Sequence, residues 1–227
     1  MSKPLFDSSC GFCTELNGID QENNLLHRVI SHESGLQSRI LYETDHFVVL
    51  PTLGALVEGY LLIVSKEHYQ CIGQLPDDLL SEFNKVVDQV KSVIRSVYQK
   101  NVVCFEHGAV SCTNKFGGCV NHTHLHIVPC GDILSGMIQD CGMELVPIPS
   151  TETLSGIAIQ DQPYLYWEDS DGRKYVIQDG FIPSQFFRKI IANYYSVAEQ
   201  WDWRQELNLE NLLKTYRTLQ PVFAKLS

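Results

Sequence analysis

The chain of 227 residues has little positive charge and no long apolar run. Its 17 Lys and Arg residues are outnumbered by 27 Asp and Glu, which gives a formal net charge of −10 at pH 7. This balance argues against sequence-independent binding of nucleic acid, which needs a basic surface. It also argues against docking on an anionic membrane. An anionic small molecule would need a local site of imidazoles, backbone N–H groups or a metal ion.

The sequence also shows no pattern typical of a targeting segment or a membrane-spanning segment. Residues 1–7 are polar, no apolar run precedes Cys10, and no segment has the roughly 20 apolar residues that cross a bilayer. We therefore expect no secretory signal and no membrane partner. The eight cysteines are spread through the chain, which favours free thiols and metal ligands in a reducing cytoplasm over a disulfide framework. The expected localisation is cytoplasmic.

Repeats and low-complexity tracts are absent, and the hydrophobic pattern predicts an α+β fold with an antiparallel sheet. Apolar residues recur at steps of three and four from Leu79 to Val97, which predicts one long amphipathic helix ending near Lys100. An aspartate of Pro76-Asp77-Asp78 is the N-cap candidate. Short runs rich in β-branched and aromatic residues predict strands at 39–42, 46–50, 59–65 and 102–106.

The pattern changes beyond Gly142, so we expect a domain at 1–141 and a C-terminal extension at 142–227 packed on it. The extension predicts a hairpin over 164–178, then helices at 183–198, with Pro183 in the first turn, and at 207–223. Between the helices lies Trp201-Asp202-Trp203-Arg204. These aromatic side chains either stack on a base or sugar or pack the extension onto the domain. Packing is the favoured interpretation.

Residues 121–129 read N-H-T-H-L-H-I-V-P. In a strand, alternate side chains share a face, so His122, His124 and His126 would stand in a row opposite an apolar face. A single histidine on a strand is usually a structural residue. Three in a row fill a core poorly, because each ring nitrogen needs a partner. The pattern therefore indicates a site for phosphate chemistry or metal binding.

A second motif, Cys10-Gly-Phe-Cys13, lies near the N-terminus. A redox pair would require a preceding strand in a β-α-β context. A zinc site would require two further nitrogen or sulfur ligands. His68, after the strand at 59–65, and His122 are the candidates. On the residues alone, a redox pair, two unrelated thiols and a zinc site all stay open.

From about Cys10 to Pro129 the chain resembles the histidine triad superfamily, which includes nucleotidyl hydrolases, nucleotidyl transferases and the galactose-1-phosphate uridylyltransferase branch. The matching features are H-T-H-L-H-I-V, the preceding Gly117-Gly118, the strand G-Y-L-L-I-V-S-K-E-H, the helix after it and the C-x-x-C. The resemblance implies a histidine-triad antiparallel sheet with one long helix, to which the hairpin-and-helix extension is added. That region looks like the extension of some bacterial members.

The C-x-x-C is similar to that of the zinc-containing members. In those members, the resemblance implies that Cys10, Cys13, His68 and His122 are the ligands of one Zn²⁺. We expect this zinc to be structural, because it would pin the N-terminus and the first triad histidine to the strand that ends at His68.

The resemblance also implies the chemistry of the other two histidines. His124 resembles the nucleophile, which attacks the α-phosphorus of a nucleotide and forms a covalent nucleotidyl-imidazole. His126 lines the phosphate pocket and helps to hold the transferred group. The expected activity is hydrolysis or nucleotidyl transfer, with dinucleoside polyphosphates or nucleotide conjugates as substrates.

The nucleotide contacts follow from the same resemblance. Backbone N–H groups around Gly118, Cys119 and Val120 would receive phosphate oxygens, because glycine allows close approach. Phe47, with Leu50, would line the base-binding pocket. Cys119 stands where many members have a hydroxyl, and a thiol is a weaker hydrogen-bond donor.

Glu106 stands where nucleotide hydrolases often carry Asn or Gln facing the phosphates. An ionised carboxylate there would repel phosphate. Glu106 is therefore protonated, binds a ribose or amine, or turns His107 toward the site, unless the two residues form a surface pair at a strand end. The departures at Glu106 and Cys119 motivate one alternative, a catalytically weak nucleotide-binding sensor or interaction protein. Among enzymes, a phosphorylase or a sugar-1-phosphate nucleotidyl transferase is the other alternative. The resemblance also allows a homodimer.

Overall fold

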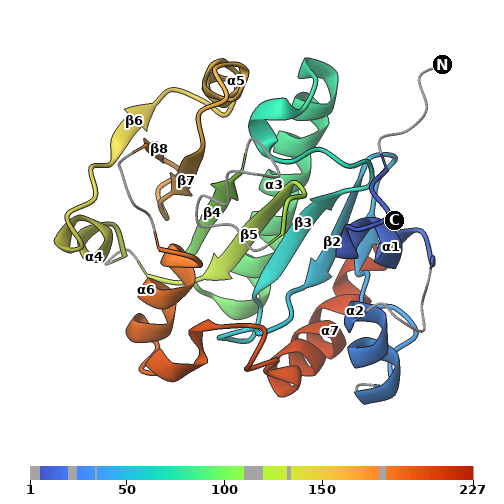
Figure 1. The fold of residues 1–227 in the computed structure, drawn as a ribbon. Helices are drawn as coiled ribbons and strands as arrows, with labels where there is room; N and C mark the ends of the chain where they lie inside the picture. Colours follow the sequence, from blue (N-terminus) through green and yellow to red (C-terminus); the bar gives the residue numbers. More distant parts are fainter. Residues whose placement is uncertain are drawn as a thin grey trace.

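The computed structural model describes residues 6–19, 25–33, 35–109, 120–131, 134–178 and 183–226. An eight-stranded sheet in the order β1-β2-β3-β5-β4-β7-β8-β6 lies at its centre (Figure 1). Each of its strand pairs is antiparallel, so the predicted α+β class is confirmed. The strands are β1 (Tyr42–Glu43), β2 (Phe47–Pro51), β3 (Leu61–Ser65), β4 (Val102–Gly108), β5 (His124–Pro129), β6 (Val146–Ile148), β7 (Tyr164–Glu168) and β8 (Lys174–Ile177).

The long predicted helix is present as α3 (Asp77–Tyr98). Its N-cap is Pro76 rather than an aspartate, and Asp77 and Asp78 occupy the first turn, where carboxylates interact favourably with the helix dipole. The C-terminal helices are α6 (Phe186–Tyr194) and α7 (Leu209–Phe223). Pro183 precedes α6 instead of lying in its first turn.

Several short helical segments were not predicted, because they offer too few residues to show a helical period. They are α1 (Gly11–Leu16), α2 (Leu25–Arg28), α4 (Leu134–Asp140), α5 (Thr153–Ile159), η1 (Val29–Glu33), η2 (Ile72–Gln74) and η3 (Ala198–Trp201). No helix in the described ranges is both long and apolar enough to cross a membrane.

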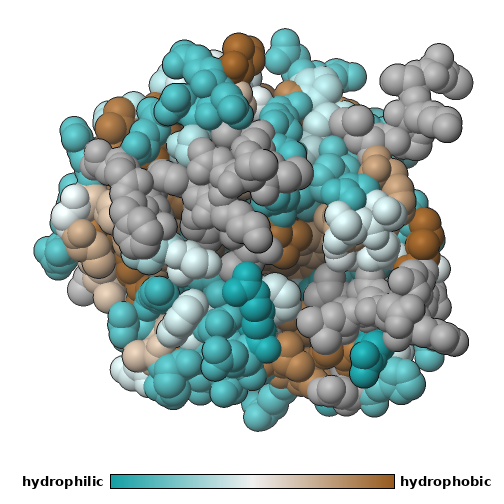
Figure 2. All heavy atoms as spheres, viewed as in Figure 1, coloured by the Kyte–Doolittle hydropathy of each residue, from teal (hydrophilic) through white to brown (hydrophobic). Residues whose placement is uncertain are grey.

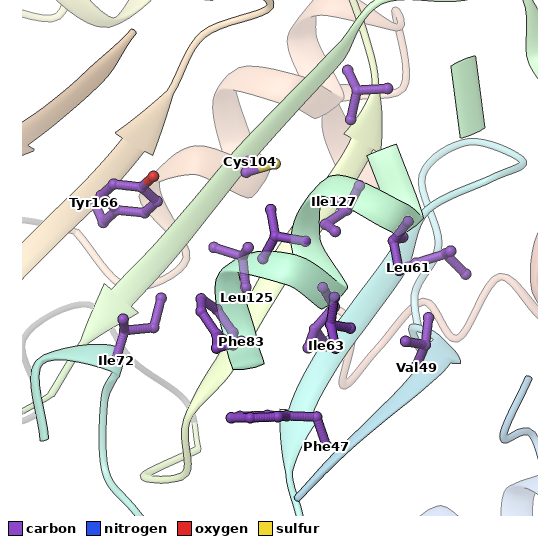
Figure 3. Close-up of a cluster of buried hydrophobic side chains, with 14 of the residues drawn as sticks. Phe47, Val49, Leu61, Ile63, Ile72, Phe83, Cys104, Leu125, Ile127 and Tyr166 are labelled. Carbon is purple, nitrogen blue, oxygen red and sulfur yellow. The ribbon is translucent and has the colours of Figure 1, made fainter. Parts of the chain in front are cut away.

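The sheet has two buried faces with different cover. One face packs under α3: Figure 3 shows Ile63, Leu125 and Phe83 in this cluster, with side chains of β2, β3 and β5 directed at the helix. The other face is covered by α1, α4 and α6, and includes Leu62 and Phe105. Figure 1 shows α6 on the side of the sheet opposite α3. The alternation of side chains along each strand assigns neighbouring residues to different faces.

The C-terminal residues continue the same sheet. The predicted hairpin is present as β7 and β8, and β7 pairs with β4, with Glu106 opposite Tyr166. Division of the chain at residue 141 stays a prediction. Figure 2 shows hydrophobic residues scattered among hydrophilic ones on the described part of this face. The exposed large hydrophobic residues of the described ranges are Phe6, Ile19, Val146, Ile159 and Leu226.

Candidate functional site

Strand β5 begins at His124, so the three histidines do not all stand in one strand row as predicted. His124 and His126 share one face, with ring centroids 5.0 Å apart. His122 precedes the strand, and its Nδ1 lies 3.3 Å from Cys10 Sγ. The backbone does not have regular strand geometry before His124. As a result, His122 faces the Cys10 thiol, whereas His124 and His126 line one pocket.

His124 is oriented by the backbone. Its Nδ1 lies 2.6 Å from the carbonyl oxygen of His122, so Nδ1–H donates and Nε2 keeps its lone pair. Burial lowers the pKa of His124 below its ordinary value, although the peptide carbonyl opposes this effect. Phe12 packs beside the ring at 5.6 Å between centroids. A neutral imidazole with a free Nε2 is a suitable nucleophile.

His126 is held by two side chains on the same face. Its Nδ1 lies 2.8 Å from the Tyr60 hydroxyl, and its ring stacks on Phe105 at 4.3 Å with 8° between the planes. The ring centroid of His107 lies 6.2 Å from that of His126. Burial lowers the pKa of His107 to about 3 and holds that of His126 well below its usual range. Both rings are therefore neutral near pH 7.

Glu106 lies on the opposite face of the sheet, so the prediction that it contacts the nucleotide is wrong. Strand β4 directs Phe105 and His107 toward His126 and Glu106 toward the α3 side. The Glu106 carboxyl accepts hydrogen bonds from the Ile72 N–H at 2.9 Å and the Tyr164 hydroxyl at 2.7 Å. Burial raises the pKa of Glu106 to about 8 despite these donors. The surface-pair alternative is also wrong, because Glu106 and His107 are both buried.

Phe47 also lies on the α3 face, which contradicts its predicted place in a base-binding pocket at the triad. Its ring packs 5.4 Å from that of Phe83 on α3 (Figure 3). In β2, Val48 and Leu50 face the triad side instead. Two other predicted contacts, Gly118 and Cys119, lie outside the described residues, whereas Val120 lines the pocket beside the triad.

That pocket is a partly open hollow of about 420 Å³, a volume that includes open solvent. Sequence reasoning missed most of its walls, which come from segments far apart in the chain. The W-D-W-R segment was the available signal for Trp203, and the C-x-x-C for Phe12. The lining residues are Phe12, Arg39, Thr52, Leu53, Leu62, Val120, His124, His126, Arg188 and Trp203.

Cys10, Cys13, His68 and His122 converge, with one donor atom from each lying within 4.8 Å of the others. Cys13 Sγ lies 3.3 Å from His68 Nδ1 and 3.6 Å from His122 Nδ1. The Cys10–Cys13 segment belongs to α1 and its N-cap, which pack against the triad side of the sheet. Two thiols and two imidazoles in this arrangement can hold a metal ion.

The surroundings of these side chains fit a cation. His122 Nε2 lies 2.7 Å from the Ser65 carbonyl oxygen, so Nε2–H donates and Nδ1 turns its lone pair toward the thiols. Burial lowers the pKa of His122 to about 4, so the ring stays neutral as a ligand must. Burial also raises the pKa of Cys10 to about 12. Ionisation of this thiol therefore needs a positive partner, which a divalent cation supplies.

The HIT domain family model matches residues 33–132. This part of the chain is therefore similar to HIT domains, which supports the resemblance to the HIT superfamily. The matched region contains His68 and all three triad histidines, while Cys10, Cys13, Arg188 and Trp203 lie outside it.

Curated relatives extend this similarity. CWF19-like protein 1 of Xenopus laevis is 29% identical over 194 residues, covering 76% of this chain and 33% of that protein. The alignment is longer than residues 1–132, so it includes residues after the region that the HIT domain model matches. An uncharacterized HIT-like protein of Methanocaldococcus jannaschii is 26% identical over 121 residues, covering 53% of this chain and 78% of that protein. The chain thus spans about a third of the CWF19-like relative.

Solved structures show similar sequences at lower identity. A histidine triad protein from Clostridium difficile is 22% identical, with a TM-score of 0.40, covering 56% of this chain and 95% of that structure. A HIT family protein from Bacillus subtilis is 21% identical, with a TM-score of 0.37, covering 47% of this chain and 72% of that structure.

Proposed function

We propose that the protein is a nucleotidyl hydrolase or transferase that works through His124. The observation that carries this proposal is the hydrogen bond of His124 Nδ1 to the His122 carbonyl oxygen, which leaves Nε2 free at the pocket. Nε2 would attack the α-phosphorus while the bond from phosphorus to the leaving-group oxygen breaks. Water or an acceptor hydroxyl would then attack phosphorus, lose its proton to solvent and release the imidazole.

The proposed substrates are dinucleoside polyphosphates or nucleotide conjugates. Two aromatic side chains, Phe12 and Trp203, line the pocket and provide surfaces on which a base can stack. His126 lies beside His124, where it would contact the transferred phosphate. The contact between the Tyr60 hydroxyl and Nδ1 fixes the orientation of the His126 ring and leaves Nε2 for the phosphate.

We also propose that Cys10, Cys13, His68 and His122 bind one structural Zn²⁺. When bound, zinc supplies a cross-link between α1 and the residues that precede β5. The chain's own residues then hold Phe12 against the rings of His122 and His124, at 5.5 and 5.6 Å between centroids. The metal site would thus support one wall of the nucleotide pocket without taking part in phosphoryl transfer.

Trapping the covalent intermediate tests the catalytic proposal. Purified protein is mixed with a diadenosine polyphosphate, quenched within seconds and analysed by peptide mass spectrometry. We expect an adenylyl group on the peptide that contains His124, and no adduct in His124→Ala. His46→Ala is the control, because His46 binds Glu82 at 2.6 Å outside the pocket lining. An adduct that persists in His124→Ala, or unchanged turnover in that variant, would contradict the proposal.

A further inference from the structure

Arg188 reaches the candidate pocket from the C-terminal part of the chain. It lies on α6, its side chain is 2% exposed, and it lines the same pocket as His124 and His126. Its Cζ lies 5.7 Å from the centre of the Tyr60 ring. Tyr60 is the residue whose hydroxyl contacts His126 Nδ1. A cationic side chain from outside the HIT domain is thus buried beside the proposed reacting groups.

The guanidinium of Arg188 is fixed at two nitrogens and free at the third. Nε donates to the Trp201 carbonyl oxygen at 2.9 Å, and Nη2 donates to the Gly54 carbonyl oxygen at 2.7 Å. Among the described residues, Nη1 is buried and makes no hydrogen bond, although the guanidinium interacts electrostatically with the neighbouring Tyr60 hydroxyl. No ion pair between described residues includes Arg188. At longer range the charge of Arg188 helps to lower the pKa of Asp202, so the two groups interact without forming an ion pair. A buried charge without a directly paired counter-charge is costly unless something else compensates it.

Arg39 lines the same pocket and shows the contrast. Its Nε and Nη2 bind both carboxylate oxygens of Glu15 at 2.8 and 2.9 Å, and its Nη1 donates to the Pro51 carbonyl oxygen at 2.6 Å. The charge of Arg39 is therefore already balanced. His126 is neutral for the reasons given above. Among the described residues that line the pocket, Arg188 is the charged residue whose side chain has an unpaired hydrogen-bond donor, Nη1.

The segment that holds Arg188 fits tightly against the HIT domain. Gly54 has φ of +67°, and a Cβ there would lie 2.5 Å from Cβ of Trp203 and 2.9 Å from Nη2 of Arg188. The Gly54 N–H also donates to the Leu207 carbonyl oxygen at 2.7 Å. Glycine at this position permits the close approach, so the guanidinium is held in place before any ligand arrives.

We propose that Arg188 binds an anionic oxygen of the substrate through Nη1, so that the C-terminal segment forms part of the substrate site. The anion is taken to be the nucleotide phosphate, which rests on the proposed function. A guanidinium suits this role because it stays charged and donates in a fixed plane. Its charge offsets locally the repulsion that a chain of net charge −10 exerts on a phosphate.

Equilibrium binding without turnover tests this role. The metal-loaded full chain is titrated with AMP and with adenosine by calorimetry, for wild type, Arg188→Met and Lys189→Met. We expect Arg188→Met to weaken AMP binding about 10- to 100-fold, as for a lost charge-assisted hydrogen bond, and adenosine binding less than about twofold. Lys189→Met is the matched control. It removes the same charge from the same helix, but Lys189 lies over the Trp201 ring outside the pocket lining.

A second measurement does not depend on folding of the variant, since Arg188→Met also removes two structural hydrogen bonds. In wild-type protein labelled with ¹⁵N-arginine, AMP should shift the guanidinium resonances of Arg188 and adenosine should not. Equal AMP affinity of a folded Arg188→Met variant, or no AMP-specific shift, would overturn the role of Arg188 and leave the proposed activity intact. A wild type that binds no AMP would overturn both. Arg188-dependent AMP binding without a His124 adduct would overturn only the proposed activity.

Discussion

The two faces of the central sheet treat buried polar groups differently. Under α3, Glu106 accepts two hydrogen bonds, and Lys91 pairs with Glu168. On the triad face, His107 Nε2 and Arg188 Nη1 are buried without a hydrogen-bond partner among the residues that the structure describes. Buried polar atoms normally find partners, so each unpaired one calls for an explanation, and for Arg188 Nη1 we propose a ligand. The paired carboxyl groups under α3 thus contrast with two unpaired nitrogen atoms on the triad face.

Two adjacent residues of β5, His124 and Leu125, face opposite sides of the sheet and should respond differently to substitution. His124→Ala should reduce turnover at least about 10³-fold with little loss of stability, because it removes the proposed nucleophile from a partly exposed position. Leu125→Ala should cost about 2–5 kcal/mol of stability, because Leu125 is buried under α3. Steady-state kinetics and urea denaturation measure both effects. Similar profiles for the two variants would show that the faces do not divide these roles.

Removal of the proposed zinc tests whether the metal stabilises the packing of α1 against the triad face of the sheet. Metal analysis should find about one zinc per chain. Chelation, or Cys13→Ser, should lower Tm by roughly 10 °C, which is about 3–5 kcal/mol for a chain of this size. Cys141→Ser is the control, because Cys141 is exposed and outside the cluster. Less than a tenth of a zinc per chain in protein with reduced thiols would defeat the metal proposal.

The buried ion pair tests the α3 face. Lys91→Met should cost about 3–4 kcal/mol, because it leaves the Glu168 carboxylate buried with the Tyr166 hydroxyl donor at 2.9 Å and Lys174 at 3.8 Å. Adding Glu168→Gln should recover at least half of that loss, since no uncompensated charge remains. Urea denaturation of the single and double variants measures the coupling. A double variant no more stable than Lys91→Met would contradict the pairing argument.

We expect Glu106 to have a smaller effect on stability, and one that depends on pH. The folded-state pKa of about 8 exceeds the ordinary value of 4.5, so its contribution is fully present below pH 4.5 and is lost as pH rises toward 8. Glu106→Gln mimics the protonated carboxyl and should remove this loss. The variant should gain about 1–3 kcal/mol relative to wild type between pH 5 and pH 8. Denaturation at both pH values checks this, and a constant difference would contradict the shift.

The corrected residues show where sequence reasoning stopped. The period of two in β5 assigned His124 and His126 to one face, and the steps of three and four defined α3. Phe47 and Glu106 were assigned to the wrong face, because a side-chain direction in a strand reverses with a shift of one residue. Neither residue carries a local signal that separates the two faces of a sheet buried on both sides.

Elements with local signals could be predicted from the sequence, namely α3, the β7–β8 hairpin, the alternation in β5 and the C-x-x-C pair. The contacts between distant segments were visible only in the folded protein. The fold brought Cys10 and Cys13 to His68 and His122, turned His107 toward His126 and placed Arg188 beside the triad. The physical reason is that periodicity and turn chemistry are properties of neighbouring residues, whereas these contacts join segments between 19 and 112 positions apart and depend on how complete faces pack.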